Sequence, residues 1–189
     1  MNDLKKGKSS AAQSKFEQLT QTHPELADGW FLLGAALQEQ GHIDEAISAY
    51  QRSLKLDTTI LANVGLMEIA NERQDWKASL QFAENAINAG GGACGHVQLY
   101  WGIAEFHLGN LSAAELAARA LGAGAQSYLL LSDTSVKRGD LSQAEQYLRE
   151  AAKLHSKDDR QAIRAKMDAL KQIQEKQRQQ SRTDQLPPK

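Results

Sequence analysis

The chain has 189 residues, which is enough for one domain with a substantial core. Its 22 Lys and Arg residues nearly balance 23 Asp and Glu residues, which argues against a protein whose whole surface binds nucleic acid or anionic membranes. The single cysteine, Cys94, excludes an intramolecular disulfide. The sequence holds no run of 18 apolar residues and no apolar leader, so we expect a cytoplasmic chain, or an exported one if it is a fragment.

Four glycines, Gly7, Gly41, Gly109 and Gly139, each precede an Ala-rich apolar stretch. The first three are separated by 34 residues or twice that number, and the last interval is 30 residues. The vacant position between the second and third glycine holds Asp75. A fixed period of this length is typical of stacked-repeat proteins, so we expect one helical unit per period.

Residues 27–58 show the unit most clearly. Apolar side chains recur every three to four residues from Trp30 to Leu37, as one face of an amphipathic helix requires. Gly41 ends this helix, and Asp44 and Glu45 begin a second one, where their charge suits the helix dipole. The unit is therefore a pair of antiparallel helices joined by a short turn.

Three further pairs are expected downstream, over residues 59–92, 95–124 and 125–156. The first of these is degenerate, and we expect its helices near residues 59–73 and 76–89. Gly90, Gly91 and Gly92 follow it, and they favour a loose loop over a hinge between repeat pairs.

The C-terminal part differs from the repeats. Over residues 157–180 an apolar stripe with spacing i, i+4, i+7 and i+10 predicts a capping helix that covers the last pair. The stripe consists of Ile163, Met167, Leu170 and Ile173. Residues 181–189 are polar and end in prolines, so a disordered tail is expected there. From Lys157 onward the chain carries a net charge of +4, against −5 before that point.

The clear unit resembles the tetratricopeptide repeat, whose pattern is W-x2-L-G-x2-Y, then A-x3-F, then P. The matching positions are Trp30, Leu33, Gly34, Leu37, Ala46 and Tyr50, while Thr58 replaces the closing proline. Parts of the pattern recur over about 150 of the 189 residues. The resemblance implies an all-α fold, a right-handed α-solenoid of antiparallel helix pairs with a C-terminal capping helix.

Residues 1–26 match only the second half of a repeat. One helix is expected around residues 9–22, with Ala12, Phe16 and Leu19 on its apolar face. Since too few residues precede it for a partner helix, three arrangements stay open. The helix lies against the next repeat, or the chain is a piece of a longer array, or a second copy or another protein completes the half-repeat.

The resemblance implies a non-catalytic protein–protein interaction module, an adaptor or assembly factor that holds a partner peptide or helix in its concave groove. By the same resemblance, the groove residues are Phe31, Asn63, Tyr100, Ile103, Phe106 and His107. A family subtype grips a partner's C-terminal carboxylate with Lys, Asn and Arg. Only Asn63 fits such a clamp here, which argues against this mode, and an apolar peptide or amphipathic helix is expected instead.

Catalysis, cofactors and metals find no support in the sequence. No glycine forms a phosphate loop, no local Ser-His-Asp or Cys-His set occurs, and Cys94 with His96 supplies too few ligands for zinc. Two alternatives to peptide binding remain. One is a self-assembling structural protein that oligomerises through Ala12, Phe16 and Leu19. The weaker one is an RNA-binding helical repeat, against which the acidic body argues.

Overall fold

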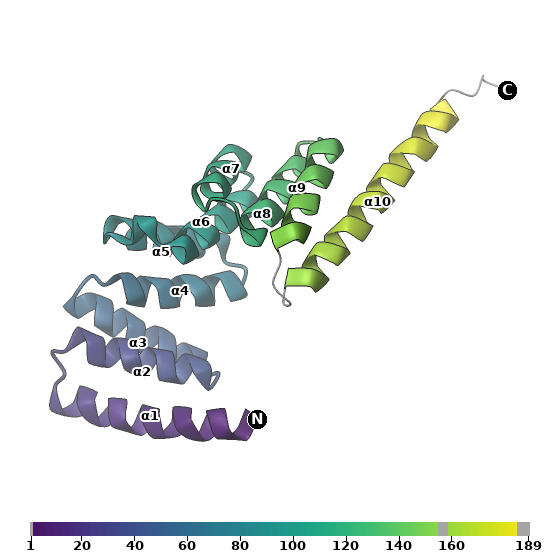
Figure 1. Ribbon diagram of the computed structural model, residues 1–189. Coiled ribbons are helices and arrows are strands. Elements are labelled where there is room, and N and C mark those ends of the chain that lie inside the picture. Colours follow the sequence, from purple (N-terminus) through teal and green to yellow (C-terminus); the bar gives the residue numbers. More distant parts are fainter. Residues whose placement is uncertain (1, 155–158, 185–189) are drawn as a thin grey trace. The chain divides into compact units, whose positions relative to one another are not determined.

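The computed structural model of the protein describes residues 2–154 and 159–184, and the side chains from residue 11 to residue 181 within these ranges (Figure 1). The helices of this part are α1 (Asn2–Thr22), α2 (Ala27–Glu39), α3 (Ile43–Leu56), α4 (Ile60–Glu72), α5 (Trp76–Asn88), η1 (Gly91–Ala93), α6 (Gly95–His107), α7 (Leu111–Ala120), α8 (Ala125–Lys137), α9 (Leu141–Leu154) and α10 (Asp159–Asp184). The described residues contain no strand. The fold is an all-α helical-repeat solenoid, as expected.

The chain divides into two compact units, Met1–Ala104 and Glu105–Lys189. In the first unit α2 pairs with α3 and α4 with α5, while α1 packs against α2. In the second unit α8 pairs with α9, α7 packs against α8, and α10 packs against α9. Short turns join the helices of each pair, so neighbouring helices run antiparallel (Figure 1).

The turns inside the pairs repeat one hydrogen-bonding pattern. Gly41, Gly109 and Gly139 have φ angles of 84°, 90° and 82°, in the left-handed region that glycine enters without steric cost. The N–H of each donates to the carbonyl three residues earlier, and the next N–H donates to the carbonyl five residues earlier, at 2.9–3.1 Å. These two bonds define a Schellman turn, which ends the first helix and begins the second.

In the degenerate pair the left-handed residue of this turn is Gln74, with φ 58°. Its N–H donates to Asn71 and the N–H of Asp75 donates to Ala70, both at 2.9 Å, as at the glycine turns. Asp75, which the glycine period placed in this slot, instead caps α5, because its carboxylate accepts from the N–H of Ala78 at 3.1 Å. The turn therefore lies one residue earlier than the glycine period indicates.

The N-terminal helix is longer than expected. It begins at Asn2 rather than near residue 9, and Gly7 lies inside it rather than in a turn. The Lys and Ser residues around Gly7 tolerate a helix, and a glycine inside a helix costs only about 1 kcal/mol relative to alanine. The period thus identified three real turns and one glycine that makes none.

The C-terminal helix also departs from expectation. Residues 181–184 continue α10 rather than beginning a disordered tail, because a helix that is already formed extends residue by residue at little cost. Residues 185–189 lie outside the described part, as does the expected boundary between the last pair and the capping helix at residues 156–157. Ile163 and Leu170 of α10 are buried in one cluster with Leu148 of α9.

A tyrosine of α3 packs closely against both α2 and α4 in the first unit. Tyr50 of α3 is only 2% exposed, and its ring fills a notch between Gly34 of α2 and Gly65 of α4. A Cβ atom added at Gly34 or Gly65 would lie 2.7 or 2.5 Å from atoms of this ring. The two glycines are therefore required by close packing, not by backbone conformation.

We predict that Gln74→Gly stabilises the protein. A left-handed conformation costs a non-glycine residue about 1–2 kcal/mol, and part of this gain is offset by the greater freedom of glycine in the unfolded chain. The expected increase in the free energy of unfolding is about 1 kcal/mol, measured by urea denaturation. Gly41→Ala is the matched control, because its Cβ meets nothing within 4 Å and only the backbone is strained. This control should be destabilised by about 1 kcal/mol, and equal stability of all three proteins would contradict the assignment.

We predict that Gly65→Ala destabilises the first unit by about 1–3 kcal/mol, the usual cost of overpacking. A decrease in the free energy of unfolding would be informative, because replacing glycine by alanine inside a helix otherwise stabilises it by about 1 kcal/mol. A double-mutant cycle with Tyr50→Leu tests the cause, since removing the ring should remove most of the penalty. Additive effects of the two substitutions would show that the ring is not responsible.

Candidate functional site

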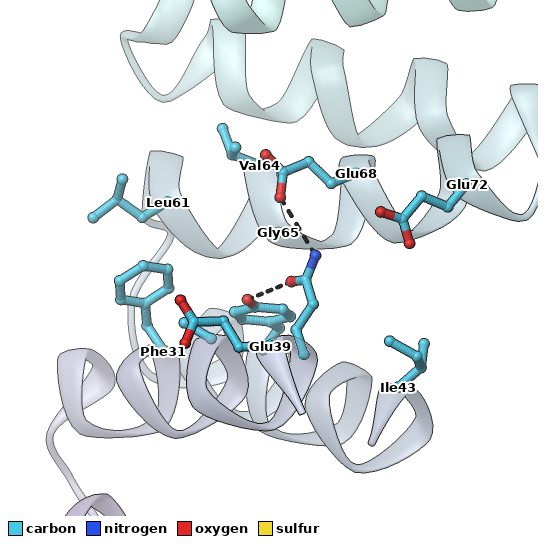
Figure 2. Close-up of a pocket in the computed structure, with 11 residues that line it drawn as sticks. Phe31, Glu39, Ile43, Leu61, Val64, Gly65, Glu68 and Glu72 are labelled. Carbon is cyan, nitrogen blue, oxygen red and sulfur yellow. Dashed lines mark hydrogen bonds between the residues drawn. The ribbon is translucent and has the colours of Figure 1, made fainter. Parts of the chain in front are cut away.

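The first unit carries an open groove between α2 and α4, with a volume of about 460 Å³ (Figure 2). We call it the α2–α4 groove. Its apolar lining consists of Phe31, Ala35, Ile43, Leu61, Val64, Gly65 and the ring of Tyr50, and its polar lining of Gln38, Glu39, Glu68 and Glu72. The residues from α4 recur at intervals of one to four along a single face of the helix, as α-helical geometry requires.

One end of the groove is apolar. Phe31 from α2 and Leu61 from α4 approach each other there (Figure 2). Leu61 is 55% exposed, which is unusual for a leucine on a helix that contributes so many buried residues. The Phe31 ring lies 6.0 Å from the ring of Tyr50, so the exposed apolar end continues into the buried core.

The polar lining is acidic. Glu39 comes from α2, whereas Glu68 and Glu72 lie one turn apart on α4 (Figure 2). No Lys or Arg is among the lining residues. Among the described residues Glu72 forms no ion pair, and the guanidinium of neighbouring Arg73 is bound to Asp44 at 2.7 Å. The groove therefore combines an apolar floor with negative charge.

A chain of hydrogen bonds holds the floor of the groove. The Tyr50 hydroxyl donates to Gln38 Oε1 at 2.7 Å, and Gln38 Nε2 donates to Glu68 Oε2 at 3.4 Å (Figure 2). The other oxygen of Glu68 lies 2.7 Å from His96 Nε2 on α6. The His96 ring lies 4.7 Å from the ring of Tyr100. The chain thus connects side chains of α2, α3, α4 and α6 within the first unit.

Burial and the nearby carboxylates raise the pKa of two tyrosines, Tyr50 and Tyr100. Burial raises the pKa of Tyr50 to about 12, and the charges of Glu68 and Glu39 contribute after burial. The pKa of Tyr100 is also raised, first by burial and then by Glu68 and Glu72. Both phenols are therefore held in their neutral, hydrogen-bond-donating form.

Of the groove residues that the sequence predicts in the first unit, only some lie at the α2–α4 groove. Phe31 lines the α2–α4 groove, and Tyr100 adjoins it through His96. Ile103 is half-buried on α6. Asn63 is 1% exposed and its amide donates to the Thr59 carbonyl at 2.9 Å, so its assignment to the groove surface is wrong. It lies about 100° around α4 from Val64, off the stripe that faces the groove.

Phe106 and His107 belong to the second unit. Phe106 is half-buried against a cluster that contains Leu130, and Lys137 Nζ lies 5.4 Å from its ring centroid. The His107 ring meets the Phe106 ring edge to face, with centroids 5.2 Å apart. Partial burial and the charge of Lys137 lower the pKa of His107. As contacts to a partner, these two residues stay a prediction.

The N-terminal apolar residues are covered within the chain. Phe16 packs against the core of the first unit, and Leu19 contacts Gly29 at the start of α2. Ala12 is half-buried, and nearby Gln13 accepts a hydrogen bond from Gln40 at 2.7 Å. The first of the three arrangements left open by the sequence is therefore realised for α1. An oligomer interface at Ala12, Phe16 and Leu19 stays a prediction.

Sequence reasoning missed the acidic groove residues and Leu61. Their spacing was a usable signal, because Leu61, Glu68 and Glu72 stand at positions i, i+7 and i+11 and so share one face of a helix. No group of three or more His, Cys, Asp or Glu residues in the described part is placed to hold a metal ion. None of the described helices combines the length and the apolar character that crossing a bilayer requires.

Two segments, residues 27–60 and 125–158, match sequence models described as Tetratricopeptide repeat. No curated protein sequence matches the chain. Similar solved structures include MamA from Desulfovibrio magneticus RS-1, with a TM-score of 0.72 and 17% identity over 80% of this chain and 88% of that chain.

Two further structures are similar at comparable levels. YrrB, described as a TPR protein with an unusual peptide-binding site, has a TM-score of 0.73 and 12% identity, over 86% of this chain and 84% of that chain. PilW, a type IV pilus biogenesis factor, has a TM-score of 0.68 and 16% identity, over 84% of this chain and 77% of that chain. Identities this low show a common fold alone. The chain therefore contains two tetratricopeptide repeats among its repeated helix pairs, and these repeats support a role as a protein-interaction module.

Proposed function

We propose that the α2–α4 groove binds a segment of a partner protein, and that the chain acts as a non-catalytic adaptor or assembly factor. The observation that carries this proposal is the exposed apolar end of the groove, where Leu61 and Phe31 border a cavity of about 460 Å³. A cavity of this size accommodates one or two partner side chains. Apolar side chains inserted there would remove Leu61 from water, at roughly 25 cal/mol per Å² of buried apolar surface.

The rigidity of the floor supports the same proposal. Tyr50 is fixed by the two glycines around its ring and by its hydrogen bond to Gln38. A floor that is ordered before binding loses little conformational entropy when a partner arrives, and this favours affinity. The aromatic side chain of Phe31, backed by Tyr50, is the kind of residue that supplies much of the binding energy in protein interfaces.

The proposed contact surface extends along α6. Tyr100 and Ile103 are half-buried and belong to the same unit as the groove, and the Tyr100 ring lies tilted beside His96, which is hydrogen-bonded to Glu68. A segment longer than the α2–α4 groove would therefore meet Tyr100 next. Phe106 and His107 are proposed as a separate contact on the second unit.

We predict that Leu61→Ala weakens binding of peptide ligands about tenfold without changing helicity. The probes are synthetic peptides selected from a phage-displayed random library on the intact chain, with affinities measured by fluorescence anisotropy. Leu116→Ala is the matched control, because Leu116 is 63% exposed on α7 and lies outside the groove. Equal affinities of both variants and the wild type for every selected peptide would contradict the groove assignment.

We predict that the free energy of unfolding falls as the pH rises from about 10 to about 12, and that part of this fall belongs to Tyr50. The raised pKa means that folded Tyr50 keeps its proton over this range while the unfolded chain loses it, so the stabilisation present below pH 10 disappears. Urea denaturation across this range should show a shallower dependence for Tyr50→Phe. Identical slopes for the two proteins would contradict the assignment.

A further inference from the structure

We propose that the α2–α4 groove selects a basic–apolar segment, in which an apolar side chain occupies the Phe31–Leu61 end and Lys or Arg side chains meet Glu68 and Glu72. This inference rests on the proposed function and adds the chemistry of the partner to it. It separates this groove from one that would hold an acidic peptide or a C-terminal carboxylate.

The first argument is the sign of the charge. Three carboxylates line the groove from two helices, and no Lys or Arg accompanies them in the lining. An anionic segment would bring like charges together where the apolar floor keeps water away on one side, and this juxtaposition is destabilising. A cationic segment instead gains charge-assisted hydrogen bonds to the same oxygens.

The second argument is that the charge is incompletely compensated within the chain. Glu68 has a partner in His96, at 2.7 Å, which is cationic only when protonated. Glu72 forms no ion pair with any described residue, and Arg73 is engaged by Asp44 at 2.7 Å. The groove thus offers at least one carboxylate whose full hydrogen-bonding capacity is available to a ligand.

The third argument is spacing along one helix. Leu61 and Glu68 are seven residues apart on α4, which corresponds to roughly 10 Å along the axis at 1.5 Å per residue. Glu72 lies about 6 Å further on. An extended segment at roughly 3.3 Å per residue would place its first basic residue about three positions from the apolar anchor and a second about two positions beyond it. In a helical segment, the first basic residue would lie about seven positions from the apolar anchor, and the second about four positions further on.

The experiment uses the phage-displayed random peptide library on the intact chain, at low and at physiological salt. We expect the enriched peptides to carry an aromatic or aliphatic residue with Lys or Arg on one side at these spacings. Their affinity should fall about threefold to tenfold in Glu72→Gln and more in Glu72→Lys. The matched control is Glu84→Gln, an exposed acidic residue on α5 of the same unit, which should bind as the wild type does.

The outcomes separate the two proposals. Enriched peptides that are neutral or acidic, yet lose binding in Leu61→Ala, would overturn the charge selectivity and leave the groove assignment in place. Basic peptides that lose affinity equally in Glu72→Gln and Glu84→Gln would also overturn it, because attraction would then be to the overall charge. If no enriched peptide depends on Leu61, the proposed function itself fails.

Discussion

The first unit depends on a single close contact, the ring of Tyr50 held between Gly34 and Gly65. Because both glycines lack a side chain, three helices approach one another around one aromatic ring. The ring belongs to the core on one side and to the floor of the groove on the other. The packing of the helices and the shape of the groove therefore depend on the same side chain.

The same tyrosine connects packing to electrostatics. Its hydroxyl donates into a chain that runs through Gln38 to Glu68 and His96, so a buried ring orders the polar lining of an open surface. The groove is thus neither a plain apolar cleft nor a plain acidic patch. Its apolar end and its carboxylates are fixed relative to each other by the core, and this arrangement favours a ligand that presents both chemistries at a defined spacing.

The sequence was sufficient for the repeat architecture, since glycine turns and a 3.6-residue periodicity depend on local backbone and helix geometry. It was insufficient where the outcome depends on packing between helices. Asn63 has the side-chain chemistry of a ligand-binding residue, yet the rotation of α4 buries it, and one helix alone does not reveal that rotation. The turn at Gln74 was displaced by one residue because a glutamine gives no sign that it adopts a left-handed conformation.

Helix α4 carries both buried packing positions and exposed groove positions, and this affects how such a protein changes during evolution. Gly65 is closed in by the Tyr50 ring and Leu66 is buried, so both tolerate little variation, whereas Leu61 and Glu72 on the same helix are exposed. Point substitutions at these exposed positions would alter the size or the charge of the proposed ligand while the scaffold stays intact. Duplicated copies of this chain could diverge in partner choice through a few codons of one helix.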